Sequence, residues 1–188
     1  MTTLAPTLTT RYFPQVSGWL RDLLLIVGGS LLVALFAQIE IPLQPVPITG
    51  QTFAVLLVGA ALGAKRGAAA LAVYLVEGIA GLPFFSGGAH GFSHLTGATG
   101  GYLIGFIAAA YLIGLLAERG LERSFRTSLI PFLAGTAIIY AFGVSWLAVV
   151  LGSLRDAVTL GLLPFLIGDA IKLVAAALAL PAAWKLVK

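Results

Sequence analysis

Long apolar segments, separated by short polar or glycine- and proline-rich stretches, are the feature that most constrains how this chain can fold. About 20 consecutive apolar residues form a helix long enough to cross a hydrocarbon core of about 30 Å. Charged residues make up only 10% of the 188 residues, against about 25% in soluble domains. The sequence therefore predicts an all-α integral membrane protein that is surrounded by membrane lipid.

The apolar segments predict six membrane-spanning helices. Four of them are the single runs at residues 20–39, 102–117, 129–151 and 162–184. A fifth run, residues 52–81, is interrupted by Lys65 and Arg66. Because a charged pair at the centre of a bilayer is costly, we expect this run to form two short helices that turn at that pair.

The basic residues orient these six helices. If the loops alternate between sides, one side carries Arg11, Arg21, Lys65, Arg66, Arg119, Arg123, Arg126, Lys185 and Lys188. The other side carries only Arg155, while Lys172 lies within the membrane. Cytoplasmic loops are enriched in Lys and Arg, so both termini are expected in the cytoplasm. Residues 1–18 are then a cytoplasmic or interfacial tail, and residues 19–188 a single six-helix membrane domain. The basic residues form no continuous stripe, so we expect no nucleic-acid partner.

Asp169 and Lys172 are ionisable residues inside the last apolar segment. Each costs about 2.5–3.5 kcal/mol at the centre of a membrane helix, so the pair requires an explanation. A spacing of three residues places both side chains on the same side of a helix. Two interpretations remain open from these residues alone: an ion pair that neutralises itself, and a polar ligand site that faces a cavity.

Two loops expected on the outer side have compositions that suit a ligand site. Residues 40–51 contain three prolines, which block helix formation, together with Gln44, Thr49 and Gln51. Neutral hydrogen-bonding side chains among apolar residues suit a lid that folds over a pocket. Residues 82–101 are rich in glycine, which lets a backbone approach a ligand closely.

Other titratable residues give weaker indications. His90 and His94 lie in the glycine-rich loop without an adjacent acidic residue, so we expect no metal site. Glu77, near the outer end of its helix, is either a site residue or an interfacial carboxylate. The chain has no Cys, no HExxH sequence, no nucleophile elbow and no GxxxxGK[ST] phosphate-binding loop. Neither catalysis nor ATP hydrolysis by this chain is therefore expected.

Four segments carry a specific resemblance. They are PVPITGQTFAVLLVGAALGAKRGA at residues 45–68, YLVEGIAGLPFFSGG at 74–88, TGGYLIGF at 99–106 and LPFLIGDAIK at 163–172. In this order they closely resemble the BioY family, the biotin-specific substrate-binding (S) subunits of energy-coupling factor (ECF) transporters. The resemblance covers about residues 39–172. Two positions depart from the family's usual pattern: Ala98 stands where Pro is usual, and Glu77 where an apolar residue is common.

The resemblance implies a six-helix ECF S-component bundle in the bacterial cytoplasmic membrane. Its vitamin pocket would lie near the extracellular side, capped by the loop between the first two helices. High-affinity biotin capture is implied, without a cofactor, with Asp169 and Lys172 contacting the ureido and carboxylate ends of the vitamin. Further candidate contacts are Gln44, Thr49, Gln51, Tyr74, Glu77, Phe85, Ser86, Gly100 and Tyr102, with His90 and His94 as additional candidates.

The resemblance also implies assembly with a transmembrane coupling subunit and two ATP-binding cassette ATPases. Ser30 and Ala34 form a small-xxx-small pair, which permits close helix approach inside the fold or to another subunit. The resemblance implies that this pair docks on the coupling subunit. Two other functions remain open: an S component for another vitamin, such as thiamine or riboflavin, and a membrane assembly protein without a small-molecule ligand.

Overall fold

Helices make up most of the computed structural model, which describes residues 3–185 of the chain. In chain order the α-helices are α1 (Leu4–Tyr12), α2 (Gly18–Ala37), α3 (Gln51–Leu62), α4 (Ala64–Ile79), α5 (Phe92–Thr96), α6 (Gly100–Ala117), α7 (Phe125–Leu151), α8 (Leu154–Gly161) and α9 (Leu166–Trp184). The 3-10 helices are η1 (Ser86–Gly88), η2 (Leu121–Arg123) and η3 (Leu163–Phe165). An antiparallel hairpin pairs β1 (Glu40–Ile41) with β2 (Ile48–Thr49). The predicted all-α class is confirmed. Lys188, which was used above to orient the helices, lies outside the described residues.

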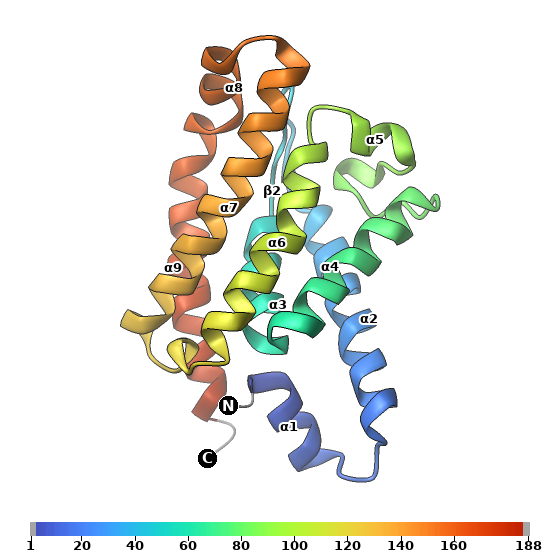
Figure 1. Ribbon diagram of the computed structural model, residues 1–188, viewed down its shortest axis with the longest axis vertical. Coiled ribbons are helices and arrows are strands. Elements are labelled where there is room, and N and C mark those ends of the chain that lie inside the picture. The colour runs from blue at the N-terminus through green and yellow to red at the C-terminus, as the bar shows by residue number, and fades with distance from the viewer. Residues whose placement is uncertain (1–2, 186–188) are drawn as a thin grey trace.

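Four helical segments are long and apolar enough to cross a membrane. They are α2, α6, α7 and the segment Leu154–Trp184, which contains α8 and α9. The helices α3 and α4 have only 12 and 16 residues, or about 18 and 24 Å at 1.5 Å per residue. Both are shorter than a hydrocarbon core of about 30 Å. In Figure 1 the strand β2 leads into α3 from above. The extended chain of β2 therefore adds to the length that the short helix covers along the bundle.

The turn between α3 and α4 lies at Gly63, just before the predicted turning point. Gly63 has a φ of 85°, a conformation that favours glycine. The Glu118 carboxylate accepts a hydrogen bond of 2.8 Å from the Ala64 N–H at the start of α4. The predicted division of residues 52–81 into two helices is confirmed, with Lys65 and Arg66 in the first turn of the second one.

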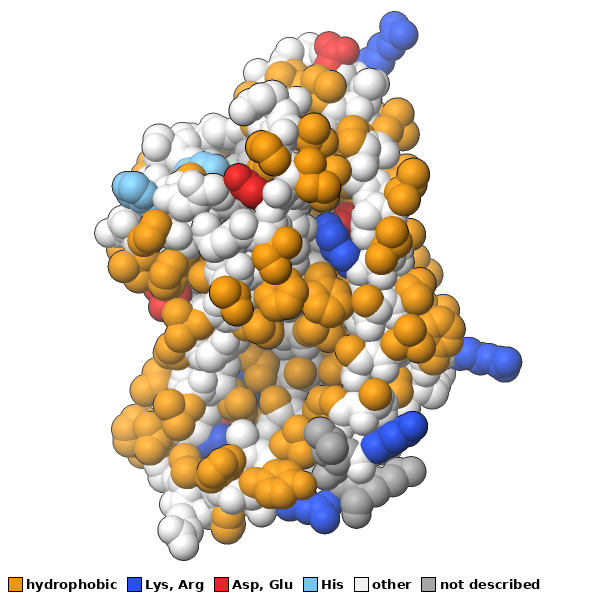
Figure 2. All heavy atoms as spheres, turned by 180° about the vertical axis from the view of Figure 1, so that it is seen from behind, with side chains coloured by type: hydrophobic (Ala, Val, Ile, Leu, Met, Phe, Trp, Pro, Cys, Tyr) orange, Lys and Arg blue, Asp and Glu red, His pale blue; other side chains and the backbone are white. Residues whose placement is uncertain are grey.

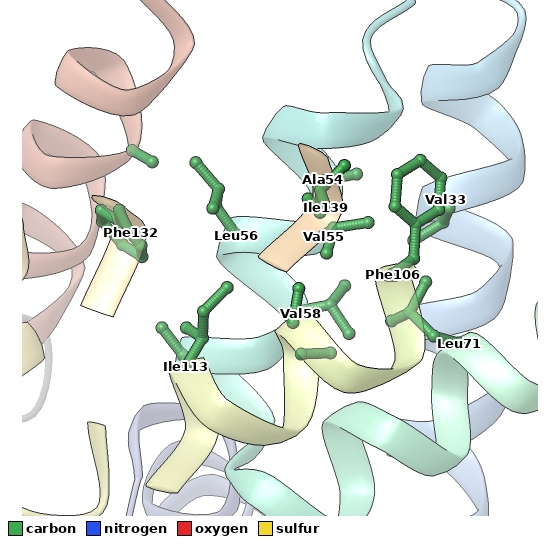
Figure 3. Close-up of a cluster of buried hydrophobic side chains, with 14 of the residues drawn as sticks. Val33, Ala54, Val55, Leu56, Val58, Leu71, Phe106, Ile113, Phe132 and Ile139 are labelled. Carbon is green, nitrogen blue, oxygen red and sulfur yellow. The ribbon is translucent and has the colours of Figure 1, made fainter. Parts of the chain in front are cut away.

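Helix α6 lies at the centre of the bundle and packs against α3, α4 and α7 (Figure 1). Glycine lets these helices approach closely, since a Cβ atom at Gly59 of α3 would lie 3.0 Å from Ala110 Cα of α6. Buried apolar side chains fill the remaining space, and Figure 3 labels ten of them: Val33, Ala54, Val55, Leu56, Val58, Leu71, Phe106, Ile113, Phe132 and Ile139. This core fixes the helices that carry the candidate site.

The N-terminal tail contains a helix that the sequence did not predict. Leu4 and Pro6 of α1 are buried, and the helix packs against α2 and α3. The Thr7 hydroxyl donates a hydrogen bond of 2.7 Å to the Thr3 carbonyl, one turn earlier. Burial of two apolar residues against the bundle therefore orders a threonine-rich segment whose own pattern is weak.

The connector predicted at residues 152–161 is also helical. The Ser153 hydroxyl accepts a hydrogen bond of 3.2 Å from the Asp156 N–H, which caps the start of α8. Ala157 and Gly161 are buried, and the helix packs against α7. The last apolar segment is thus preceded by an ordered turn of helix instead of a loop.

The expected docking pair on α2 lies inside the fold. Ser30 is 0% exposed and Ala34 6%, and the Ser30 hydroxyl donates to the Val27 carbonyl at 2.9 Å. A Cβ atom at the neighbouring Gly29 would lie 2.9 Å from Ala70 Cβ of α4. The small residues of α2 therefore permit close packing within this chain. Docking of Ser30 and Ala34 on another subunit stays a prediction, and in the isolated chain both side chains are buried.

The surface differs in composition along the long axis. Figure 2 shows many Lys and Arg side chains toward the lower end, where α1 lies in Figure 1, and hydrophobic side chains spread over the middle. Large exposed hydrophobic residues on α7 and α9 include Leu133, Val149, Ile167, Ile171 and Leu178. Extensive exposed apolar surface marks contact with a membrane or another protein, which fits the apolar composition of these helices.

Candidate functional site

Asp169 and Lys172 of α9 belong to a polar cluster that includes Thr52 of α3 and Tyr140 of α7. Lys172 Nζ lies 2.8 Å from Asp169 Oδ1 and donates to Thr52 Oγ1 at 3.0 Å. The Thr52 hydroxyl donates to Asp169 Oδ1 at 3.0 Å, and the Tyr140 hydroxyl donates to Asp169 Oδ2 at 2.5 Å. We call these four residues the Asp169 cluster. Asp169 is 7% exposed, and its carboxylate is matched by one ammonium and two hydroxyl donors.

The backbone before Asp169 places its carboxylate at a helix start. Pro164 lies in the 3-10 turn η3 between α8 and α9, where the missing N–H of proline interrupts a continuous helix. Helix α9 therefore begins at Leu166, with Asp169 in its first turn. The partial positive charge at the start of a helix stabilises a carboxylate there.

The Asp169 cluster lies in the wall of an inner cavity between α3, α6, α7 and α9. The volume of this cavity is about 40 Å³. Its apolar wall includes Val46, Leu103, Phe106, Ile139 and Phe165. Its polar wall includes, besides the cluster, Thr49, Gln51, Ser86, His94, Thr99 and Tyr102. Apolar walls with a few placed polar groups are typical of small-molecule sites.

Gln51, at the start of α3, connects the inner cavity to the glycine-rich loop. Its Nε2 donates to the Tyr74 hydroxyl at 2.6 Å, and that hydroxyl donates to the Phe84 carbonyl at 3.2 Å. The Thr49 hydroxyl donates to Gln51 Oε1 at 2.9 Å. Tyr74 is 1% exposed, so it supports Gln51 from behind and does not line the cavity.

An outer cavity of about 330 Å³ lies between the proline-rich loop and the glycine-rich loop. Pro47, Ser86, His94 and Thr99 line both cavities. The inner and outer cavities are therefore neighbours, divided by residues of the two outer loops whose compositions suit a ligand site. Gln44 lines the outer cavity.

His94 of α5 is one of the residues at this division. Its ring stacks on Phe85, with 5.0 Å between the ring centroids. Its Nε2 lies 3.2 Å from the Thr99 hydroxyl oxygen. Burial lowers the pKa of His94 below its usual value of 6.5, so the ring is neutral at pH 7.

Besides the additional candidate His94, six of the predicted contacts lie in the wall of the inner cavity: Asp169, Lys172, Thr49, Gln51, Ser86 and Tyr102. The Tyr102 hydroxyl donates to the Gly161 carbonyl at 2.7 Å, which joins α6 to the end of α8. Phe85 is 0% exposed and packs between Tyr74 and His94. Phe85 therefore shapes the loop under the cavity without reaching its surface.

The sequence predicts ligand contacts at Gly100 and Glu77, but the structure brings neither residue to the inner or the outer cavity. A Cβ atom at Gly100 would lie 1.7 Å from the Leu95 carbonyl oxygen, so this glycine permits close packing beneath the loop. Glu77 is half-buried on α4, and its Oε2 has no hydrogen-bond partner among residues 3–185. Direct contact of either residue with a ligand stays a prediction.

The two histidines lie in different surroundings. His90 is exposed, with Nδ1 at 3.4 Å from the Gly88 carbonyl oxygen, whereas His94 faces the cavities. Within the described part of the chain, no group of three or more His, Cys, Asp or Glu side chains is placed to hold a metal ion.

Thr52 and Tyr140 are site residues that the sequence interpretation missed. Tyr140 is a polar aromatic in the middle of an apolar helix, and a buried tyrosine hydroxyl usually finds a partner. That signal could have identified it. Thr52 offers no comparable signal, because its partners Asp169 and Lys172 are more than 100 residues away in sequence.

Comparisons with known proteins agree on one family. The family model described as "BioY family" matches residues 5–188. A "Biotin transporter BioY" of Thermotoga maritima is 47% identical over 78% of this chain and 86% of its own length. Another, of Rhizobium etli, is 38% identical over 84% and 90%. A crystal structure of the S component for biotin from an ECF-type ABC transporter matches with a TM-score of 0.75 and 25% identity, over 90% of this chain and 95% of that one. On these grounds the chain belongs to the BioY family.

Proposed function

We propose that this chain captures biotin for uptake across the cytoplasmic membrane of a bacterium, as the substrate-binding subunit of an ECF-type ABC transporter. The observation that carries the proposal is the Asp169 cluster in the wall of a mostly apolar cavity, in a chain of the BioY family. Biotin combines a ureido ring with two N–H groups, an apolar middle and a carboxylate. The named biotin transporters and the biotin S component among its relatives support the same ligand.

Asp169 and Lys172 would serve complementary groups of this ligand. A carboxylate accepts N–H donors, and an ammonium donates to a carboxylate or a carbonyl. Tyr140 and Thr52 fix the Asp169 carboxylate before the ligand arrives, which reduces the ordering cost of binding. Neutral hydrogen-bonding groups around the ligand would come from Thr49, Gln51, Ser86 and Tyr102.

Binding would require the inner cavity to widen. Its volume of about 40 Å³ is well below the roughly 300–1,000 Å³ of typical ligand sites. The outer cavity offers about 330 Å³ between the two loops. The ligand would reach the Asp169 cluster from the outer cavity as the loops separate near Ser86 and His94.

The membrane placement in this proposal has six crossing segments and cytoplasmic termini. α2, α3, α4, α6, α7 and α9 would be the crossing helices, with α3 and α4 completed by extended chain. Basic residues support the orientation, because Lys65, Arg66 and the arginines of η2 and its flanks lie on the side of α1. This distribution follows the enrichment of Lys and Arg in cytoplasmic segments. The site would then open to the outside.

A transmembrane coupling subunit and two ATP-binding cassette ATPases would complete the transporter. The sequence has no GxxxxGK[ST] phosphate-binding loop, so partners would hydrolyse ATP. Because Ser30 and Ala34 are buried in the isolated chain, exposed residues would supply most of the contact with the coupling subunit.

The test is a titration of biotin into the detergent-purified chain by isothermal calorimetry. The proposal expects binding tighter than micromolar at about one biotin per chain. Thiamine and riboflavin, titrated in the same buffer, are the control ligands. Neither should bind as tightly as biotin. Binding of biotin no tighter than micromolar, or stronger binding of another vitamin, would overturn the proposal.

A further inference from the structure

A third cavity lies at the end of the molecule that carries α1, away from the Asp169 cluster (Figure 1). Its volume is about 480 Å³, larger than that of the inner or the outer cavity. The residues that line it come from α1, α2, α4 and the end of α6: Thr3, Pro6, Thr7, Thr10, Arg11, Arg21, Arg66 and Glu118. We call it the α1 cavity. Biotin capture at the Asp169 cluster does not use it.

The lining of the α1 cavity has an excess of positive charge. It contains three arginines and one glutamate. The Glu118 carboxylate accepts a hydrogen bond of 2.8 Å from the Ala64 N–H. Arg66 pairs with Asp22 through Nε and a terminal nitrogen, at 2.8 and 3.2 Å. These contacts fix two walls of the cavity. With Asp22 counted, three arginines and two carboxylates leave one net positive charge around it.

Arg21 supplies the observation that points to a ligand. One terminal nitrogen of its guanidinium donates to the Thr10 hydroxyl at 2.9 Å, which orients the group toward α1. Its buried Nε–H has no acceptor among residues 3–185. A buried donor without an acceptor costs about 1–3 kcal/mol. Because Arg21 also lines the α1 cavity, an anion bound there would offer its guanidinium the missing acceptor.

Aromatic residues place the α1 cavity at the level of lipid headgroups. Tyr12, Phe13 and Trp19 lie at the end of α1 and the start of α2 and are 59%, 62% and 72% exposed. Exposed Trp and Tyr are enriched at membrane–water interfaces. Basic pockets between helices on the cytoplasmic side suit anionic lipid headgroups.

We propose that the α1 cavity binds a phosphate group, and that its source is the headgroup of an anionic phospholipid in the cytoplasmic leaflet. This inference rests on the membrane placement proposed above. The arginines would bind the phosphate oxygens, since a planar guanidinium can donate two parallel hydrogen bonds to a phosphate. Such a lipid would fasten α1 to α2 and α4 at the base of the bundle.

The experiment compares lipid retention by native mass spectrometry. The full-length chain is purified in detergent and incubated with phosphatidylglycerol or phosphatidylcholine of matched acyl chains. We expect the wild type to retain phosphatidylglycerol at least about fivefold better. Arg21→Gln should lower that preference about fivefold, as expected when roughly 1 kcal/mol per basic residue is lost at an anionic surface. Arg155→Gln, an exposed site on α8 at the other end of the bundle, is the matched control and should behave as wild type.

Additional measurements distinguish a lipid headgroup from free phosphate and from the absence of a site. Inorganic phosphate at the lipid concentration should not displace phosphatidylglycerol; displacement at that concentration would overturn the lipid as source. Equal retention of the two lipids, or an unchanged preference in Arg21→Gln, would overturn the inference. Arg11→Gln provides a second test if Arg21→Gln does not purify as a monodisperse protein. Biotin titration of the same samples reports on the proposed function separately, so intact biotin binding with no lipid preference would refute only the lipid site.

Discussion

The Tyr140 hydroxyl reaches from α7 to Oδ2 of Asp169 on α9, while Lys172 and Thr52 contact the other carboxylate oxygen. Both oxygens of a nearly buried carboxylate are therefore held from two sides. An ion pair that merely neutralised itself would need only Lys172. The additional contacts from α3 and α7 fix the direction in which the carboxylate faces the inner cavity.

The first prediction concerns the charged pair. Asp169→Asn and Lys172→Ala should each weaken biotin binding at least about tenfold, since a buried group left without its partner costs about 1–3 kcal/mol. Calorimetric titration of the purified variants measures the change. Asp156→Asn, at an exposed position of α8, serves as the control and should bind as wild type. Unchanged affinity in both site variants would return the pair to a purely structural role.

Tyr140→Phe isolates the contribution of one hydroxyl. This substitution removes the donor to Asp169 Oδ2 and keeps the ring, so binding should weaken about fivefold, the equivalent of roughly 1 kcal/mol. Tyr111→Phe is the matched control, because Tyr111 is 45% exposed on α6 and should tolerate the change. Calorimetric titration of biotin measures the affinity of both variants. Equal affinities would contradict a role for Tyr140 in orienting Asp169.

Stability should depend on pH through His94. Burial lowers the pKa of His94 in the folded chain, so below about pH 6.5 the unfolded chain binds more protons and stability falls as the pH drops. The thermal unfolding midpoint of the wild type should therefore decrease between pH 7 and pH 5. His94→Gln should reduce this decrease.

His90→Gln provides the control for that prediction, because His90 is exposed in the same loop. It should retain the pH dependence of the wild type. Tryptophan fluorescence during heating in detergent gives the midpoints. Comparing the variants with the wild type at each pH removes the contribution of other titrating groups to the shift in midpoint. One such group is Glu122, whose pKa is raised by burial. Parallel curves for the wild type and His94→Gln would contradict the prediction.

Two glycines should respond in opposite ways to alanine. A Cβ atom at Gly114 of α6 would lie 2.2 Å from the Ala64 backbone nitrogen, so Gly114→Ala should destabilise the bundle by about 1–3 kcal/mol. At Gly168 of α9 no atom lies within 4 Å of an added Cβ. Gly168→Ala should leave stability unchanged or raise it by up to about 1 kcal/mol, because alanine favours helix. Thermal unfolding in detergent measures both, and equal midpoints would contradict the packing of α6 on the α3–α4 turn.

Much of the fold follows from local sequence properties. Apolar length predicts α2, α6 and α7 closely, because a helix that satisfies its own backbone is one of the few structures stable in lipid. The cost of Lys65 and Arg66 within a bilayer correctly predicts the division of residues 52–81. Two helices were missed for different reasons: the pattern of α1 is weak, and α8 is amphipathic but has only eight residues. Helices this short form mainly through contacts with the rest of the bundle.

The sequence by itself determined that the chain is an apolar helical bundle and that Asp169 and Lys172 share one side of their helix, because length, hydropathy and helical period are local properties. Only the tertiary structure decided what surrounds that pair. It brings Thr52 and Tyr140 to Asp169, leaves Glu77 and Gly100 out of the walls of the two cavities, and buries Ser30 and Ala34 inside the fold. The physical reason is that helix packing is set by complementary shapes of side chains far apart in sequence, which no local pattern encodes.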